Sequence, residues 1–396
     1  MSASSSSAVP FIPIGPVFPP EITDSIIKEL APNIRVLRIC SLVCRSWLPA
    51  SRYILHHALS LRGEDVPGFL GIISSPDNTY FASLRAIDIS LCENGPTSSL
   101  LALLPQFRCL KIIRVYSSIF HYESTIIPSV TTLEISDTHF RSFAAFTNLI
   151  SRLPNLKNLK IQNISWGSMY VRGLATTEAE INTSNTPPRL ELDTLFAQMS
   201  NDTHFLDWLC SGESGALTRS LTLLLPRRSA ESDRVSEYLR YLNAHLKSLH
   251  VRFSEVSRVM GLDFSTNTSL QSIRLDFYDM CGWWRPPPNS PDSQLYFCEE
   301  LPNLLGRFHS RHIDELIIDV YATATIKRPM SIERLASALC AFPFSRIRKL
   351  QFNGRWASGS NEFVLDREIF TSNVVDKLPV SPSRTIVLFD PSAPSA

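Results

Sequence analysis

Two cysteines have the spacing of a possible metal site. Cys40 and Cys44 are four residues apart, which would place both thiols on one face of a helix. Zinc needs four ligands, and no histidine or second cysteine pair stands near these two in the sequence. We therefore interpret both cysteines as helix-packing residues and predict no metal site.

Other candidates for catalysis have the wrong spacing. The pairs His56-His57 and His309/His312 lack a glutamate at the position that metalloproteases require. Residues 212–215, Gly-Glu-Ser-Gly, do not have the spacing of a nucleophile elbow, and the 14 glycines are too scattered to form a phosphate-binding loop. We predict that the protein is not an enzyme and needs no cofactor, and keep a catalytic α/β domain as the least favoured alternative.

Length and charge set broad limits on the chain. Its 396 residues are too many for one ordinary compact core, and 44% of them are hydrophobic, as in a folded protein. The net charge is +1 without a long basic run, so we predict no nucleic-acid partner. We interpret Arg227-Arg228 and the cluster Arg346, Arg348 and Lys349 as solvated residues.

The N-terminal segment does not predict export. Residues 1–17 are rich in serine and then proline, and they lack the basic start of a secretory signal. No run of about 18 apolar residues is present, so no membrane span is expected. Eight cysteines in a chain of this kind are then reduced thiols, in a cytoplasmic or nuclear protein.

Three short helices are expected next. Pro20 suits the first position of a helix, and Ile22 and Ile26 lie on one apolar stripe of it. Residues 31–33, Ala-Pro-Asn, end that helix, and a second helix that is apolar on more than one side follows. Three helices in about 40 residues make a marginal core, so this unit should need support from a partner.

Two motifs flank this unit. Pro19-Pro20-Glu21-Ile22 opens it and Leu42-Val43-Cys44-Arg45-Ser46-Trp47 closes it, a pair that resembles the F-box, although Pro19 stands where that family usually has leucine. The resemblance implies docking on the Skp adaptor of cullin–RING ubiquitin ligases. Carried over position by position, the adaptor-binding residues would be Pro20, Ile22, Ile26, Leu37, Leu42, Val43, Cys44 and Trp47. The alternative is that these residues only form an internal helical core.

A second pattern recurs after residue 80: apolar, two residues, apolar, one residue, apolar. Five of the eight intervals between copies are 20 to 28 residues, which is typical of leucine-rich repeats, and a weaker copy at residues 190–192 fills the longest gap. Copies begin at Leu84, Leu110, Val130, Leu156, Thr218, Leu246, Leu270, Ile313 and Ile347.

Helical segments are expected between these copies, at residues 99–104, 143–153, 232–243 and 332–342. Strand then helix, repeated, predicts a parallel sheet. The fold class we predict is an α/β solenoid: a three-helix F-box module followed by a degenerate leucine-rich repeat horseshoe. An ordinary α/β domain with a parallel sheet is the alternative.

The predicted organisation has four parts. They are a disordered lead-in (1–17), the F-box-like module (18–60), the irregular repeats (61–380) and a proline- and serine-rich tail (381–396). Long loops are expected at 162–189 and 277–300; the second contains Trp283 and Trp284, which either bind a target or cap the solenoid.

F-box and irregular leucine-rich repeats together are similar to the F-box proteins of mushroom-forming fungi. The resemblance implies the substrate-recognition subunit of a Skp–cullin–F-box ubiquitin ligase, with an unknown protein target. The alternative is a non-degradative scaffold that binds a partner through its repeats.

Overall fold

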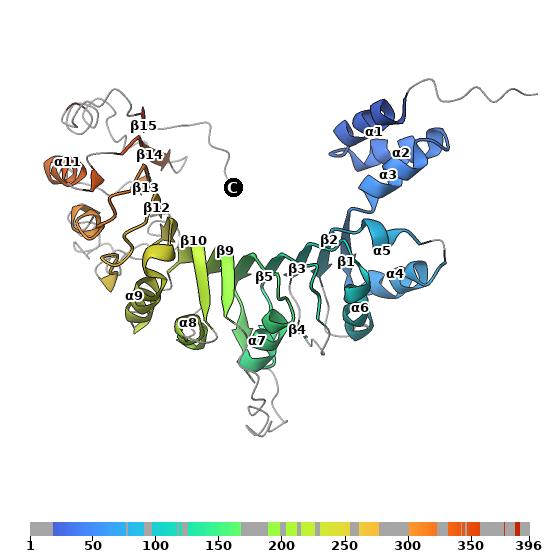
Figure 1. Ribbon diagram of the computed structural model, residues 1–396, viewed down its shortest axis with the longest axis horizontal. Helices are drawn as coiled ribbons and strands as arrows, with labels where there is room; N and C mark the ends of the chain where they lie inside the picture. Colours follow the sequence, from blue (N-terminus) through green and yellow to red (C-terminus); the bar gives the residue numbers. More distant parts are fainter. Residues whose placement is uncertain are drawn as a thin grey trace, which may run out of the picture.

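The computed structural model forms an arc with strands along its inner side and helices along its outer side (Figure 1). Three helices stand at one end of this arc, ahead of the first strand. The residues that the structure describes are 19–76, 78–90, 97–116, 119–120, 126–167, 189–198, 203–211, 215–225, 230–253, 261–276, 301–322, 332–341, 343–344, 347–356, 376 and 385–388.

The three N-terminal helices are α1 (Pro20–Glu29), α2 (Ile34–Val43) and α3 (Leu48–Leu55), and α3 packs against both others. The Asn33 side chain caps α2 by accepting a hydrogen bond from the Val36 N–H at 3.2 Å. Few side chains are buried among these helices: Thr23, Ile27, Leu37, Cys40 and Ser51. The large hydrophobic core of the chain contains none of them and begins only at Leu61.

Only two residues, His56 and His57, separate α3 from the first strand, and side chains brace this junction. The His56 ring stacks on Tyr80 with centroids 4.2 Å apart, and its Nδ1 lies 3.1 Å from the Thr79 hydroxyl. The Arg85 guanidinium donates a hydrogen bond to the Tyr53 hydroxyl and lies over that ring, 5.6 Å from its centroid. The helical unit is therefore fixed to the end of the sheet.

The main sheet has twelve strands, and each pairs in parallel with the next. The predicted parallel sheet is thus confirmed. In spatial order the strands are β1 (Ala58–Arg62), β2 (Ala86–Ser90), β3 (Ile112–Tyr116), β5 (Thr132–Ser136), β7 (Asn158–Gln162), β9 (Leu190–Gln198), β10 (Ala216–Leu224), β11 (Ser248–Arg252), β12 (Ser272–Asp276), β13 (Glu315–Ala322), β14 (Lys349–Trp356) and β15 (Thr385–Leu388).

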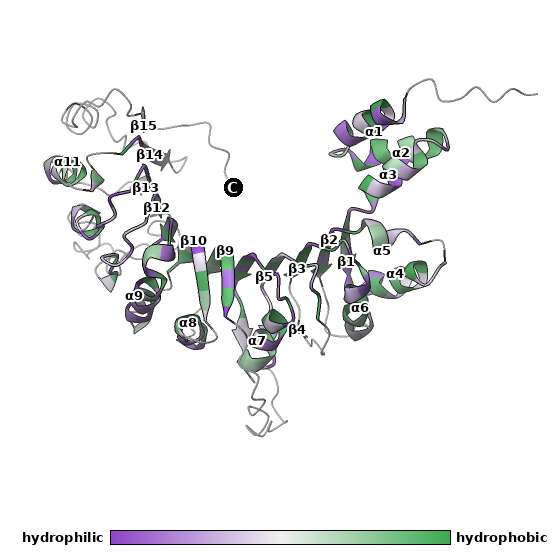
Figure 2. Cartoon of the chain, in the orientation of Figure 1, coloured by the Kyte–Doolittle hydropathy of each residue, from purple (hydrophilic) through white to green (hydrophobic). Residues whose placement is uncertain are grey.

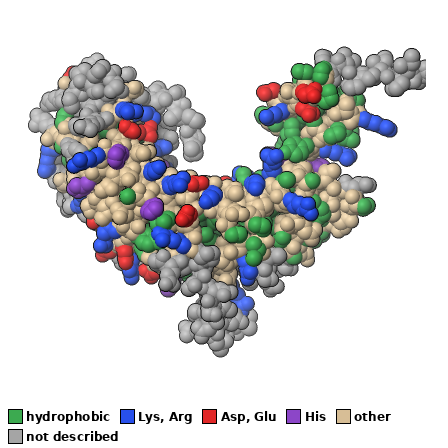
Figure 3. Space-filling view, in the orientation of Figure 1, with side chains coloured by type: hydrophobic (Ala, Val, Ile, Leu, Met, Phe, Trp, Pro, Cys, Tyr) green, Lys and Arg blue, Asp and Glu red, His purple; other side chains and the backbone are tan. Residues whose placement is uncertain are grey.

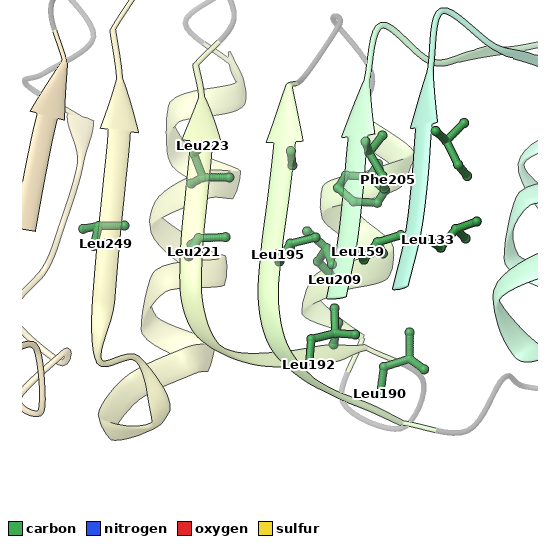
Figure 4. Close-up of a cluster of buried hydrophobic side chains, with 14 of the residues drawn as sticks. Leu133, Leu159, Leu190, Leu192, Leu195, Phe205, Leu209, Leu221, Leu223 and Leu249 are labelled. Atoms are coloured by element: carbon green, nitrogen blue, oxygen red, sulfur yellow. The ribbon is translucent and has the colours of Figure 1, made fainter. Parts of the chain in front are cut away.

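A row of leucines crosses the centre of the sheet, one from each of five neighbouring strands (Figure 4). Leu133, Leu159, Leu195, Leu221 and Leu249 are successive register partners, and each is at most 1% exposed. Because side chains alternate between the two faces of a strand, the leucine pattern puts its apolar residues on the helix-covered face and the residues between them on the inner face.

Helices cover the outer side of the sheet, and Figure 2 shows hydrophobic segments in them. Helices α6, α7, α9 and α11 confirm the four predicted helical segments to within about three residues. The helical elements are η1 (Gly63–Asp65), α4 (Val66–Ile73), α5 (Tyr80–Ser83), α6 (Thr97–Leu103), η2 (Leu104–Gln106), α7 (Phe143–Ser151), α8 (Thr203–Cys210), α9 (Ala230–Leu242), η4 (Asn243–His245) and α11 (Ile332–Cys340).

A second sheet of three short parallel strands lies beyond the ends of β3, β5 and β7: β4 (Ile119–Phe120), β6 (His139–Phe140) and β8 (Ser165–Trp166). Asp137 and Asn163, with φ of 51° and 48°, make the turns into β6 and β8. Asp and Asn tolerate this left-handed conformation better than most residues. The Asn163 amide donates to Asp137 Oδ1 at 3.0 Å, which links the two turns.

Several predicted boundaries were wrong. Residues 58–60, which we assigned to the helical module, begin β1. Residues 385–388, assigned to the tail, form β15, the twelfth strand. The weak copy at 190–192 was placed in the wrong frame, because Leu195, rather than Leu190, pairs with Leu159 and Leu221.

Other predictions concern residues outside the described part. They are the lead-in 1–17, most of the loop 162–189, the whole loop 277–300 with Trp283 and Trp284, and most of the tail 381–396.

The leucine row predicts that substitutions at a buried and at an exposed position differ strongly in their effect on stability. Leu133→Ala should destabilise the protein by about 2–5 kcal/mol, because it leaves a cavity between two paired strands and the helices. Lys157→Ala, at an exposed position beside β7, should change stability by less than about 0.5 kcal/mol. Thermal and urea unfolding followed by circular dichroism will measure both; equal effects would contradict the placement of Leu133 in the core.

Candidate functional site

Exposed apolar side chains concentrate on the three N-terminal helices. Of the nine large hydrophobic residues that are exposed in the described part of the chain, seven lie between residues 22 and 53. Figure 3 shows hydrophobic side chains gathered on this lobe. The seven are Ile22, Ile26, Ile34, Ile39, Leu42, Val43 and Tyr53. Such a cluster marks an interaction surface, because isolated exposed apolar residues are ordinary but a contiguous group of them is not.

Helix α2 is apolar on two opposite faces. Leu37 and Cys40, three residues apart, point into the unit and are 1% and 5% exposed. Ile39, Leu42 and Val43 have the spacing i, i+3 and i+4 and form the other face, with exposures of 63%, 85% and 59%. The internal core satisfies one face, and no element of the described residues covers the second.

Helix α1 shows the same division on a smaller scale. Thr23 and Ile27 are buried against the unit's core, whereas Ile22 and Ile26 are 48% and 39% exposed. The apolar stripe expected from the sequence is therefore split, because Ile27 and not Ile26 faces inward. We define the docking face by Ile22, Ile26, Ile39, Leu42 and Val43.

Most of the candidate positions taken from the motif lie at the surface of the helical unit. Pro20, Ile22, Ile26, Leu42, Val43 and Cys44 are exposed, and Trp47 is half-buried. Leu37 is a correction: it is a core residue and does not lie on the docking face.

Besides Tyr53 of α3, two exposed residues, Ile34 and Ile39, were missing from the predicted set. Both lie on α2 and are 58% and 63% exposed. The signal for them was present in the sequence as an α2 segment with apolar residues on more than one side.

Cys44 follows α2 directly and has an altered thiol. It is exposed, and its Sγ lies 3.0 Å from the Ser46 hydroxyl oxygen. The hydrogen bond from Ser46 lowers the pKa of this thiol below its ordinary value, helped by the backbone N–H groups of Trp47 and Ser46. Cys40, in contrast, is buried, so the two thiols do not form a common ligand pair.

The remaining candidates for chemistry are bonded locally. His56 packs on Tyr80, and the His309 Nδ1 lies 2.8 Å from the Arg307 carbonyl oxygen. Among the residues described, no group of three His, Cys, Asp or Glu side chains could hold a metal ion. In the same part of the chain, no helix is both long and apolar enough to cross a membrane.

The inner face of the sheet carries a ladder of paired charges near its N-terminal end. Asp88, Arg114, Glu134 and Lys160 are register partners on β2, β3, β5 and β7. Arg114 bridges Asp88 at 2.9 Å and Glu134 at 3.1 Å, and the Lys160 Nζ lies 3.9 Å from Glu134. Its two positive and two negative charges sum to zero, so the ladder adds no net charge to the inner face.

A second polar network lies on the same face toward the C-terminal strands. The carboxylates of Asp276 and Asp319 are 6% and 5% exposed and are register partners. Arg252 lies 3.1 Å from Asp276, and Arg274 lies 2.6 Å from Asp319. Buried carboxylates with charged partners can be structural as well as functional, and no catalytic arrangement follows from them.

No protein-family model matches the sequence, and no curated protein matches it either.

Two aspartate substitutions in α2 should separate its faces. Leu42→Asp should leave the melting temperature within about 2 °C of wild type and reduce binding of a hydrophobic dye, because Leu42 is 85% exposed. Leu37→Asp should unfold the helical unit, because it buries a charge without a partner. Limited proteolysis at residues 20–55 will detect that loss, and a fully folded Leu37→Asp protein would contradict the assignment of faces.

The thiols should differ in their pH dependence. Burial raises the pKa of Cys210 to about 12, whereas the pKa of Cys44 is lowered, so iodoacetamide should alkylate Cys44 first as the pH rises toward neutrality. Ser46→Ala removes the main stabilising hydrogen bond and should move the Cys44 reaction to higher pH. Peptide mass spectrometry will measure both sites; an unchanged pH profile in Ser46→Ala would rule out the role of the hydroxyl.

Proposed function

We propose that the protein is the substrate-recognition subunit of a Skp–cullin–F-box ubiquitin ligase. Its N-terminal helices dock on the Skp adaptor, and a leucine-rich repeat solenoid binds a protein target. One observation carries this proposal: the docking face lies on the helices that contain the F-box-like motif. The adaptor would cover a surface that this chain leaves open.

The energetics support docking by helices in a groove. Fully burying one side chain such as Leu42 or Ile39 contributes about 1.5–3 kcal/mol. The docking face offers five such side chains on two helices that both pack on α3, and a few apolar anchors of this kind supply most of the energy of a helix–groove interface. A partner of this sort would also stabilise a unit with so few buried residues.

The sheet supports the repeat assignment. Strand order follows chain order from β1 to β15 within the main sheet, and one register row of leucines runs through its centre. Each unit contacts mainly its neighbours, which is the organisation of a solenoid. Under this proposal the helical unit comprises about residues 18–57, and the repeats run from β1 to β15.

The mechanism is positioning. The chain makes and breaks no bonds itself; it holds a target near the ligase, which raises the local concentration of the target's lysines there. The braced junction at His56 and Tyr53 joins both binding regions. The compartment would be cytoplasmic or nuclear, where cullin–RING ligases act.

The decisive variant is Leu42→Asp/Val43→Asp. It should bind the purified Skp adaptor at least about 100-fold more weakly than wild type, because two interface anchors are replaced by charges. The control is Ile72→Asp/Ile126→Asp, which introduces the same two charges at exposed apolar residues, 54% and 53% exposed, outside the helical unit. Biolayer interferometry with both folded variants will measure the affinities, and the control should bind like wild type.

Failure of the folded wild-type protein to bind the adaptor would remove the ligase assignment and leave a repeat scaffold. If the adaptor binds, the half-life of the target distinguishes a degradative from a non-degradative role. Depleting this protein should lengthen the half-life of a target that the ligase degrades and leave the half-life of a scaffolded partner unchanged.

A further inference from the structure

Cations accumulate along one row of register-equivalent residues at the start of the paired part of the sheet. In most strands this residue stands just before the strand, and in β9 and β10, which begin three residues earlier, it lies inside the strand. These residues occupy equivalent places, because the N–H of one donates to the carbonyl oxygen of another on the preceding strand. Lys111 donates to Arg85 at 2.7 Å, Lys247 to Arg219 at 2.8 Å, and Arg348 to Asp314 at 2.9 Å. Six of the eleven described positions in this row are basic, and we call these six the basic rim: Arg85, Lys111, Lys157, Arg219, Lys247 and Arg348.

The charge of this row is out of proportion to the charge of the chain. Asp193 and Asp314 are its two acids, and His57, Thr131 and Gln271 are its three neutral members at pH 7. Six cations less two acids give +4, whereas the whole chain has a net charge of only +1. The rest of the protein is therefore net acidic, and the positive charge is concentrated along one edge.

The rim is accessible. All six basic residues are exposed. Along the edge, the row advances by about 4.8 Å from one strand to the next. Arg219 pairs with Asp193 at 3.7 Å and Arg348 with Asp314 at 3.5 Å. Within the described residues, Lys111, Lys157 and Lys247 have no ion pair. In Figure 3, Lys and Arg side chains predominate over acidic ones along the inner edge of the arc.

We propose that the basic rim binds an extended, Asp- and Glu-rich segment of a protein partner. Complementary charge on such a segment would speed encounter and fix its register along the strands. The adjoining inner face offers uncharged amide and hydroxyl groups from Asn158, Thr194, Ser220 and Ser248, which suit peptide groups. A polypeptide fits this row better than a nucleic acid, whose uniform phosphate charge would be repelled by the row's two acids.

This inference concerns the target-binding half of the proposed function and does not require adaptor binding. The two can therefore fail separately: the adaptor assay tests the docking face alone, and the assay below tests the rim alone.

The test uses the full-length protein and a fluorescein-labelled peptide of 16 glutamates, about the length that spans the row. The variant Lys111→Glu/Lys157→Glu/Lys247→Glu reverses the three rim lysines. The control variant Arg141→Glu/Arg240→Glu/Arg334→Glu reverses three exposed cations outside the row, so both change the net charge from +1 to −5. Fluorescence anisotropy will be measured at two salt concentrations, with a 16-nucleotide poly-dT strand as a competing probe.

Wild type and the control variant should bind the glutamate peptide with affinities within about threefold of each other, and the rim variant at least about tenfold more weakly. Binding should weaken with salt. Equal weakening in both variants would assign the effect to net charge and overturn the proposal. Tighter binding of poly-dT than of the peptide would overturn the proposal and indicate a nucleic-acid surface. If wild type does not bind the peptide, the proposal is also overturned, and the row is purely structural.

Discussion

The structure depends on in-register stacking of apolar side chains between parallel strands. A leucine such as Leu195 is buried only because Leu159 and Leu221 flank it and helices cover the row. No strand of this length could bury its apolar face alone. Strand order therefore follows chain order, and the described helices that cover the row lie on one side of the sheet. The inner face is left for polar residues, including the charge ladder from Asp88 to Lys160.

The N-terminal helices obey a different constraint. They bury few side chains, and α2 has more apolar surface than the internal core can cover. Leu37 and Cys40 use one face of that helix, which leaves Ile39 and Leu42 in solvent. The unit thus combines low intrinsic stability with an exposed apolar face. These two properties suit a module that is completed by a partner.

Much of the fold was predictable because the leucine pattern is local. The leucine pattern identified the strands of the main sheet from β2 to β14 apart from β9, where Ala197 occupies a position usually held by a larger residue and hides the frame. β15 was missed because its four residues lie in a segment whose composition resembles a tail. Sequence patterns of this kind register apolar periodicity and say little about strands without it.

The candidate sites were less predictable, because they depend on direction and on distant residues. The motif named Leu37 as a surface contact, but which face of a helix turns inward is decided by packing against α3. The basic rim was invisible in sequence because its members stand about one repeat or more apart. A charge density that arises only when strands align cannot be found by searching for charged runs.

The braced junction between α3 and β1 also has a mechanical consequence. With two intervening residues and contacts from Tyr53 to Arg85 and from His56 to Tyr80, the orientation of the helices is set by the first strands of the sheet. Two molecules bound at opposite ends of the arc would keep a nearly constant separation. Changing that separation would require bending the strands themselves, so the curvature of the sheet sets the reach between them.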